Sequence, residues 1–321
     1  MSLQSAMDLG YRFYREPPLK NVDCEALRPI NLHARYLHDL LDLATLNPGF
    51  MFDQEQAAGD WNRIKQWLRM AAGLRFVEVE PHDDDSSYMC GPAHDYAYAH
   101  NYLACLYATE ETRLIYAWSA VEQLLGSIAV PRYPGIDDKH IYDRGAALLS
   151  ESFPLPTLPP HYLYVYSHLM DHLANDKERR ADRRLRAATK LRDSRTQAGI
   201  LLTAGNAMRN FPAHGDVDVP EPQDWAGAGS TRVEVLPSEL HAHRLATRGL
   251  LLSLQMLLAL TCDFTSSAHS DVHYVVPWLH ESCDHLPLIF SVPLSTLLLR
   301  AHIEPVRENE IEDSFFTEWC N

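Results

Sequence analysis

The sequence predicts a mainly α fold: a bundle of four long helices within residues 93–263, flanked on both sides by small mixed α/β segments. Apolar residues recur at helical spacing over long stretches of the central region, whereas the flanks contain short alternating stretches that favour strands. Loops rich in proline and glycine separate the helical stretches. We therefore expect three regions: a mixed helical and strand region at 1–92, the helical bundle at 93–263, and a mixed extension at 264–321.

The N-terminal region is expected to contain two helices, at residues 32–46 and 54–74, followed by a short strand at 75–80. The strand is predicted from the alternation of side chains along that segment. A loop at 81–92, which holds three consecutive aspartates, marks the boundary with the bundle. The second helix carries an apolar stripe at helical spacing, formed by Trp61, Ile64, Trp67 and Leu68.

The four bundle helices are expected at residues 95–128, 161–193, 196–211 and 239–262, with Ser238 as the N-cap of the last one. Three of them carry apolar stripes that should face the core. These stripes are Leu114, Trp118, Val121 and Leu125 in the first helix, Leu201, Ala204, Met208 and Phe211 in the third, and Leu250, Leu254, Leu257 and Thr261, widened by Leu251 and Leu258, in the fourth.

The remaining segments are expected to be connections and strands. Residues 129–160 contain six prolines and form a long connection with a short helix at 143–151. A connection of this length is uncommon inside a compact domain and suggests a functional loop. Beyond the bundle, residues 272–279 and 288–292 are expected to form strands.

Charge is distributed unevenly along the chain. The net charge of −15 argues against a protein that coats nucleic acid, yet residues 177–195 hold nine basic and three acidic residues. Within this segment, basic side chains recur at i, i+4, i+7 and i+11 and form a stripe on the expected helix. The stripe is either a solvated charged face or a contact surface for an RNA backbone or phosphate. Its members are Arg179, Arg183, Arg186 and Lys190.

The segment 205–216 gathers the side chains that best suit chemistry on a phosphodiester. Arg209 and Asn210 lie on one helix face with Asn206, and His214 follows after Pro212, where the helix is expected to end or kink. An arginine supplies a permanently charged fork for phosphate oxygens, and a histidine titrates near neutral pH. Taken singly, the arginine could instead form a salt bridge at the helix end, and the histidine could lie in an ordinary turn.

The residues 209–215, with the sequence Arg-Asn-Phe-Pro-Ala-His-Gly, resemble the R-N-x-x-x-H motif of HEPN domains, a superfamily of all-α bundles. The helix around 117–125, with Glu122, is also similar to an earlier helix of that group. The resemblance covers residues 93–263 and does not extend to the flanks. Pro212 within the motif departs from the usual pattern of the family.

The resemblance implies a metal-independent endoribonuclease that acts as a homodimer, with two motifs facing one cleft, and needs no cofactor. It implies that Arg209 and His214 form the catalytic pair, that Asn210 supports them, and that Glu122 packs nearby. For Glu122 alone, a half-buried carboxylate paired with a basic side chain is the simpler interpretation. In biological terms the resemblance suggests a toxin or phage-defence effector. The alternative is a non-catalytic bundle that binds nucleic acid, a nucleotide or a partner protein.

Other classes of site receive less support from the sequence. His168 and His172, four residues apart around Asp171, form a possible metal pair, but no further ligands stand at suitable spacing, so no metal is expected. The sequence contains no Walker A, dinucleotide-binding or nucleophile-elbow motif. The six cysteines are scattered without C-x-x-C pairs, which suggests free thiols in a reducing cytoplasm. We expect neither a secretory signal nor a membrane span.

Overall fold

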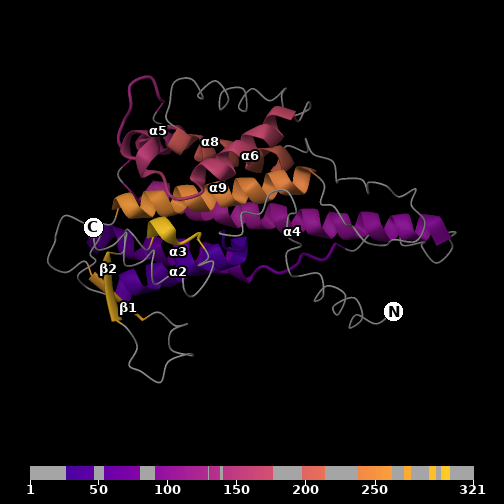
Figure 1. Cartoon of the computed structure of the whole chain (residues 1–321), viewed down its shortest axis with the longest axis horizontal. Helices are drawn as coiled ribbons and strands as arrows, with labels where there is room; N and C mark the ends of the chain where they lie inside the picture. Colours follow the sequence, from indigo (N-terminus) through magenta and orange to yellow (C-terminus); the bar gives the residue numbers. More distant parts are fainter. Residues whose placement is uncertain are drawn as a thin grey trace.

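The computed structural model describes residues 27–46, 54–79, 91–128, 130–137, 140–175, 197–213, 238–261, 271–275, 289–293 and 298–303. Within these ranges the chain is mainly helical, which confirms the expected fold class at that level (Figure 1). The α-helices are α2 (Ile30–Leu46), α3 (Gln54–Gly73), α4 (Gly91–Ser127), α5 (Ile141–Ser152), α6 (Tyr162–Asn175), α8 (Ile200–Ala213) and α9 (Ser238–Thr261). Short 3-10 helices are η2 (Leu155–Thr157) and η5 (Gln197–Gly199), and the strands are β1 (Asp271–Val275) and β2 (Ile289–Pro293).

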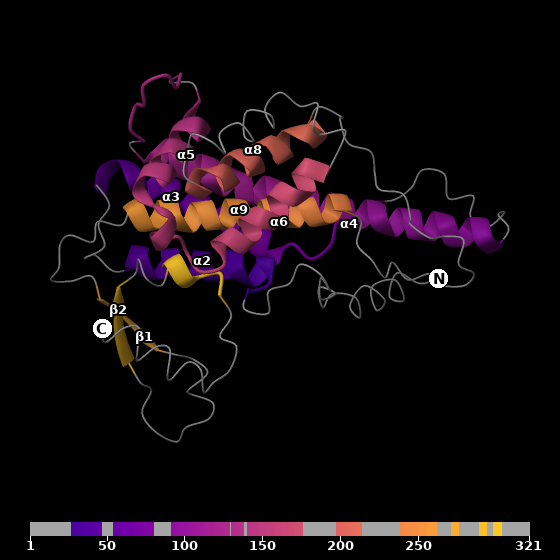
Figure 2. The same cartoon turned by 45° about the horizontal axis from the view of Figure 1, so that its top comes forward.

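The helices lie in three layers. Helices α4 and α9 run side by side through the middle, α2 and α3 cover one side, and α5, α6 and α8 cover the other (Figures 1 and 2). The N-terminal part of the 37-residue helix α4 extends beyond the other labelled helices. No helix in the described ranges is long and apolar enough to cross a membrane.

Helix α9 is the central element of the core. From Leu240 to Ala259 nearly every side chain is buried, because neighbouring helices cover α9 on several sides. Helix α8 approaches it closely at two glycines: a Cβ atom at Gly205 would meet the Leu250 side chain, and one at Gly249 would meet Leu201. These close contacts set the position of α8 relative to α9, and with it the position of the C-terminal end of α8.

The expected helices and their core stripes agree with the structure where it describes them. The stripe residues of α4, those of α9 from Leu250 to Leu258, and Leu201, Ala204 and Met208 of α8 are buried. The short helix in the proline-rich connection is present as α5. Residues 176–196, which include the second half of the expected helix 161–193, lie outside the described residues. Helix α8 does not end before Pro212 but runs on to Ala213, so the proline lies in the last turn of the helix.

The strand expected at 75–80 is wrong for the residues that the structure describes, since 74–79 form no regular element. The backbone groups of this segment bond to side chains of α4 instead of a neighbouring strand. The amide of Val77 donates to Thr109 Oγ1 at 2.9 Å, and the amide of Val79 donates to Cys105 Sγ at 3.4 Å. The alternating side chains of this segment therefore belong to a stretch that packs along α4. Side chains of α4 accept the hydrogen bonds that a neighbouring strand would otherwise accept.

A single hydrophobic cluster contains buried residues from all three expected regions, from Leu27 through the bundle helices to Ala301. Helices α2 and α3 therefore pack on α4 and α9 as part of the same core. The two strands pair antiparallel, with Asp271 opposite Pro293 and Val275 opposite Ile289. The first strand is shorter than the expected 272–279, and residues 276–279 lie outside the described ranges.

A buried hydrogen-bond chain ties the segment 298–303 to the bundle. His302 Nε2 lies 2.6 Å from the carbonyl oxygen of Pro160, so this nitrogen must donate, and His302 Nδ1 then accepts from Gln255 Nε2 at 3.0 Å. Gln255 Oε1 accepts in turn from His33 Nε2 at 2.8 Å. Protonation would turn His302 Nδ1 into a donor, so the link from Gln255 to this nitrogen holds only while His302 is uncharged, whereas the bonds that the two Nε2 atoms donate do not require a neutral ring.

Candidate functional site

The candidate site lies where the end of α8 meets α4 and α5. Helical spacing places Asn206, Arg209 and Asn210 on one face of α8, while Met208 on another face is buried in the core. The apolar face holds the helix against α9, so the polar face is presented to Trp118 of α4. Because Met208 is buried in the core, the adjacent Arg209 is directed away from α9 and toward Trp118.

Arg209 is half-buried and is held by two uncharged groups. Its guanidinium carbon lies 3.8 Å from the centroid of the Trp118 ring, within the range of a cation–π contact. Its Nη1 donates a hydrogen bond of 2.8 Å to Asn210 Oδ1. No carboxylate in the described ranges lies within ion-pair distance of Arg209. The guanidinium is therefore fixed in place and keeps its charge uncompensated by these contacts.

Asn210 and Asn206 complete a closed set of contacts around the arginine. Asn210 is buried, and its Nδ2 donates to the backbone carbonyl of Asn206 at 2.8 Å, which turns its Oδ1 toward Arg209. The side chain of Asn206 accepts a 3.1 Å hydrogen bond from Trp118 Nε1. The amide of Asn210 is thus engaged in orienting Arg209 within α8.

Tyr142 of α5 lies beside Trp118 and close to Glu122 of α4. The rings of Trp118 and Tyr142 stack with centroids 5.8 Å apart and an interplanar angle of 18°. Burial raises the pKa of the Tyr142 hydroxyl, the Glu122 carboxylate raises it further, and the positive charge of Arg209 opposes this rise. Glu122 is half-buried and, within the described part of the chain, forms no ion pair with a basic side chain.

Of the residues that the sequence singled out, the structure brings Arg209, Asn210 and Glu122 to one place. His214 lies outside the described residues, just after the end of α8. The basic stripe of Arg179, Arg183, Arg186 and Lys190 also lies outside them.

Two members of the site were not expected from the sequence. Trp118 was assigned to the apolar stripe of its helix, and nothing in the proline-rich connection distinguished Tyr142. One signal was present for the tryptophan: it precedes Glu122 by one helical turn, on the helix that the family resemblance had already selected.

Among the residues that the structure describes, no third ligand joins the possible metal pair of His168 and His172. His168 packs edge-on against Tyr164 at 4.3 Å between ring centroids, and His172 stacks on His241 at 5.9 Å. Within the ranges that the structure describes, no group of three or more histidine, cysteine, aspartate or glutamate side chains could hold a metal ion.

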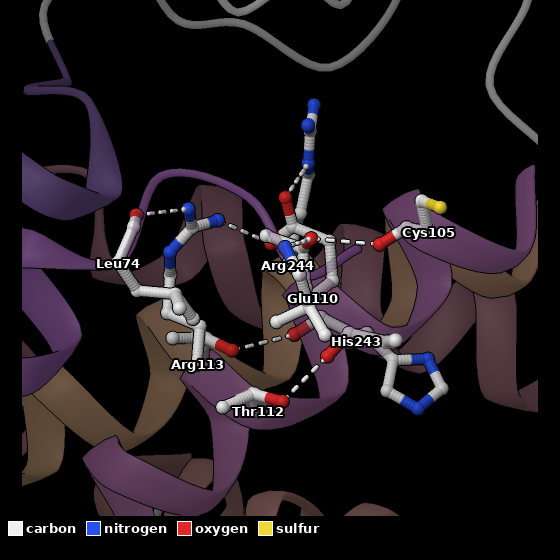
Figure 3. Close-up of polar contacts among 11 residues, drawn as sticks. Leu74, Cys105, Glu110, Thr112, Arg113, His243 and Arg244 are labelled. Carbon is white, nitrogen blue, oxygen red and sulfur yellow. Dashed lines mark hydrogen bonds and ion pairs between the residues drawn. The ribbon is translucent and has the colours of Figure 1, made fainter. Parts of the chain in front are cut away.

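A second polar cluster, which no local pattern in the sequence predicts, is buried between α4 and α9 (Figure 3). Glu110 accepts from Arg113 Nη1 at 2.7 Å and from Arg244 Nε at 3.0 Å, and Arg113 Nη2 donates to the carbonyl of Leu74 at 3.1 Å. Burial alone would raise the pKa of Glu110, but the two guanidinium groups outweigh it and lower the pKa. The cluster ties α9 to α4 and, through Leu74, to the segment after α3.

Comparison with known proteins gives no relative: the chain matches no family model, no curated protein and no solved structure.

Proposed function

We propose that the chain is a metal-independent endoribonuclease of the HEPN type, which cleaves RNA at the end of α8. Arg209 binds the scissile phosphate, His214 transfers the proton, and Asn210 orients the arginine. In this proposal α4, α6, α8 and α9 correspond to the four-helix arrangement of that superfamily, and α2, α3 and α5 are additions to it. No metal or other cofactor takes part in this mechanism.

The observation that carries the proposal is the arrangement of Arg209. A structural arginine that is half-buried usually has a carboxylate partner, because an unpaired charge is costly to remove from water. Here the partners in the described part of the chain are an indole face and an amide oxygen. Such partners fix the position of the guanidinium without competing with an anionic ligand for its charge. A phosphodiester oxygen is the ligand that this planar donor set suits best.

The reaction needs only groups of this kind. The 2′-oxygen of a ribose attacks the adjacent phosphorus, the bond from phosphorus to the 5′-oxygen of the next nucleotide breaks, and the leaving oxygen takes up a proton. His214, as base and then acid, accepts the hydroxyl proton and returns one to the leaving oxygen. Arg209 stabilises the charge that builds on the phosphoryl oxygens. The products carry a 2′,3′-cyclic phosphate and a 5′-hydroxyl.

Substrate delivery and assembly complete the proposal. The basic stripe of Arg179, Arg183, Arg186 and Lys190 contacts the RNA backbone. Two chains form a homodimer in the cytoplasm, so that two Arg209–His214 sets serve one cleft. The biological role is that of a toxin or phage-defence effector that attacks cellular or phage RNA.

The test is cleavage of tRNA and mRNA by the purified protein in excess EDTA. We expect cleavage that persists in EDTA, leaves cyclic phosphate ends, and spares DNA of the same sequence, which lacks the attacking hydroxyl. Arg209→Ala and His214→Ala should each lower the rate by about 100-fold or more. Arg69→Ala, an exposed arginine on α3 in the opposite layer, is the matched control and should cleave as the wild type does.

Each alternative has its own result. RNA binding without cleavage in the wild type would identify a non-catalytic bundle. Activity that disappears in EDTA and returns with a divalent cation would identify a metal-dependent hydrolase. Cleavage that survives in both Arg209→Ala and His214→Ala would show that the chemistry lies elsewhere in the chain.

A further inference from the structure

Trp118 makes more contacts around Arg209 than an apolar core residue requires. Its ring face meets the guanidinium, its other contacts include the stacked ring of Tyr142, and its Nε1 is bonded to Asn206. The side chain is 9% exposed, so its position is fixed by packing. An indole in this setting is a rigid surface against which a flexible arginine side chain can be held.

The anchoring of the indole also comes from α8 itself. Asn206 binds Trp118 through its side chain and binds Asn210 through its backbone carbonyl. Asn210 then binds Arg209. One turn of α8 thus fixes both the surface beneath the guanidinium and the amide at its edge. A guanidinium has more N–H donors than the single bond to Asn210 uses, and the structure records no other hydrogen bond from Arg209 to the described residues.

We propose that Trp118 is a positioning residue for Arg209: the indole face and the Asn210 amide hold the guanidinium without neutralising it, so that its remaining donors face a phosphodiester. This inference rests on the proposed function, in which Arg209 binds the scissile phosphate. Trp118 itself does not touch the RNA. Its effect passes through the arginine and depends on the aromatic face, with the hydrogen bond to Asn206 holding that face in register.

The test compares variants that keep or remove the aromatic face. Trp118→Leu removes it and should lower kcat by about 10- to 100-fold with a smaller change in KM, since a displaced catalytic group loses rate more than binding. Trp118→Phe keeps an aromatic face and should recover most of the rate. Asn206→Ala leaves the indole unanchored and should fall between the two. Trp61→Leu, which removes a buried tryptophan from α3, controls for general damage to the core.

A spectroscopic readout checks the contact without any reaction. The Nε–H proton of Arg209, assigned by its loss in Arg209→Lys, should show an upfield ring-current shift. That shift should disappear in Trp118→Leu and remain in Trp61→Leu. A merely structural role for Trp118 would lower stability in both tryptophan variants and leave kcat per folded molecule unchanged in both.

Failure of the inference and failure of the proposed function give different results. If the wild type cleaves RNA, Arg209→Ala does not, and Trp118→Leu cleaves at the wild-type kcat, the positioning role is overturned and the nuclease stands. If the wild type cleaves no RNA, the nuclease proposal fails, and the positioning role is judged on the Kd for a 2′-O-methyl RNA. In that case Trp118→Leu must weaken binding of the 2′-O-methyl RNA as Arg209→Ala does. An unchanged Kd in Trp118→Leu overturns the positioning role.

Discussion

Glu110 of α4 and Arg244 of α9 form an ion pair of 3.0 Å across 134 positions of the sequence, with side chains only 3% and 8% exposed. Arg113 completes the cluster from the same helix as the glutamate. Two guanidinium groups therefore share one buried carboxylate. Because the carboxylate is the common partner, the two sides of this cluster should respond unequally to mutation.

Glu110→Gln should destabilise the protein by about 3–5 kcal/mol, since it removes the one carboxylate that two buried guanidinium groups share. Arg244→Met should cost clearly less, because Glu110 retains its 2.7 Å pair with Arg113. Urea unfolding of both variants measures the difference. The exposed pair of Arg35 and Asp39, at 3.9 Å, is the control, and Arg35→Met should change stability by less than about 1 kcal/mol. An equal loss in Glu110→Gln and Arg244→Met would contradict the shared role of the carboxylate.

Stability should fall as the pH drops below neutrality, because two buried histidines are held neutral. Burial, followed by the charge of His302, lowers the pKa of His33 well below 6.5. Burial is also the main cause that lowers the pKa of His302 to about 4. Arg28 and Arg248 act on His33 in the same direction, while His161, Arg248 and Arg300 act on His302.

The sign follows from proton uptake. Between a pH of 6.5 and about 4, an unfolded chain protonates His302 and the folded chain does not, so acid favours unfolding. His33 acts in the same direction, because its pKa in the folded chain is also lowered. The stabilisation is complete above the unfolded pKa and is lost as the pH falls toward the folded pKa, by about 1.4 kcal/mol per pH unit and histidine at most. Unfolding free energies in urea from pH 7 to pH 5 test this, and His302→Gln should flatten the slope. A slope unchanged in that variant would exclude His302 as a source.

Two glycines with opposite surroundings give a third prediction. A Cβ atom at Gly199 would collide with the backbone carbonyl of Ala146 in α5, whereas one at Gly126 in α4 would meet nothing within 4 Å. Gly199→Ala should therefore destabilise by about 1–3 kcal/mol, because a backbone cannot yield as a side chain can. Gly126→Ala should stabilise by about 0.5–1 kcal/mol through its better helix propensity. Thermal unfolding of the two variants, measured side by side, should shift in opposite directions.

The parts of the fold that the sequence predicted are those set by local periodicity. The apolar stripes of α3, α4 and α9 follow from spacing alone, and the structure buries Trp61, Ile64 and Leu68 of α3, the α4 stripe, and the α9 stripe from Leu250 to Leu258. The segment 75–80 was misread because alternation reports an extended chain and says nothing about which partner satisfies its backbone. Thr109 and Cys105 of a helix fill that role here.

The candidate site was predictable in its α8 half, whereas in its α4 and α5 half only Glu122 was expected, and that from the family resemblance. Asn206, Arg209 and Asn210 share a face by helical geometry, so their proximity follows from the sequence. The contact of Arg209 with Trp118, and of Trp118 with Tyr142, joins separate helices and depends on how they pack. The same holds for Glu110 and Arg244, whose pairing no local pattern encodes.

The last prediction concerns the shape of the cation at the site. Arg209→Lys keeps the positive charge but removes the planar fork, the hydrogen bond in its present geometry to Asn210, and much of the surface in contact with Trp118. If the guanidinium acts by directing its donors at phosphate oxygens, the lysine variant should lose about 100-fold or more in cleavage rate, close to the loss in Arg209→Ala. Its affinity for 2′-O-methyl RNA should fall by less, because the charge remains. Single-turnover cleavage and equilibrium binding separate the two effects. A lysine variant with near wild-type cleavage would show that charge alone suffices, and that the fixed orientation of the arginine has no part in the chemistry.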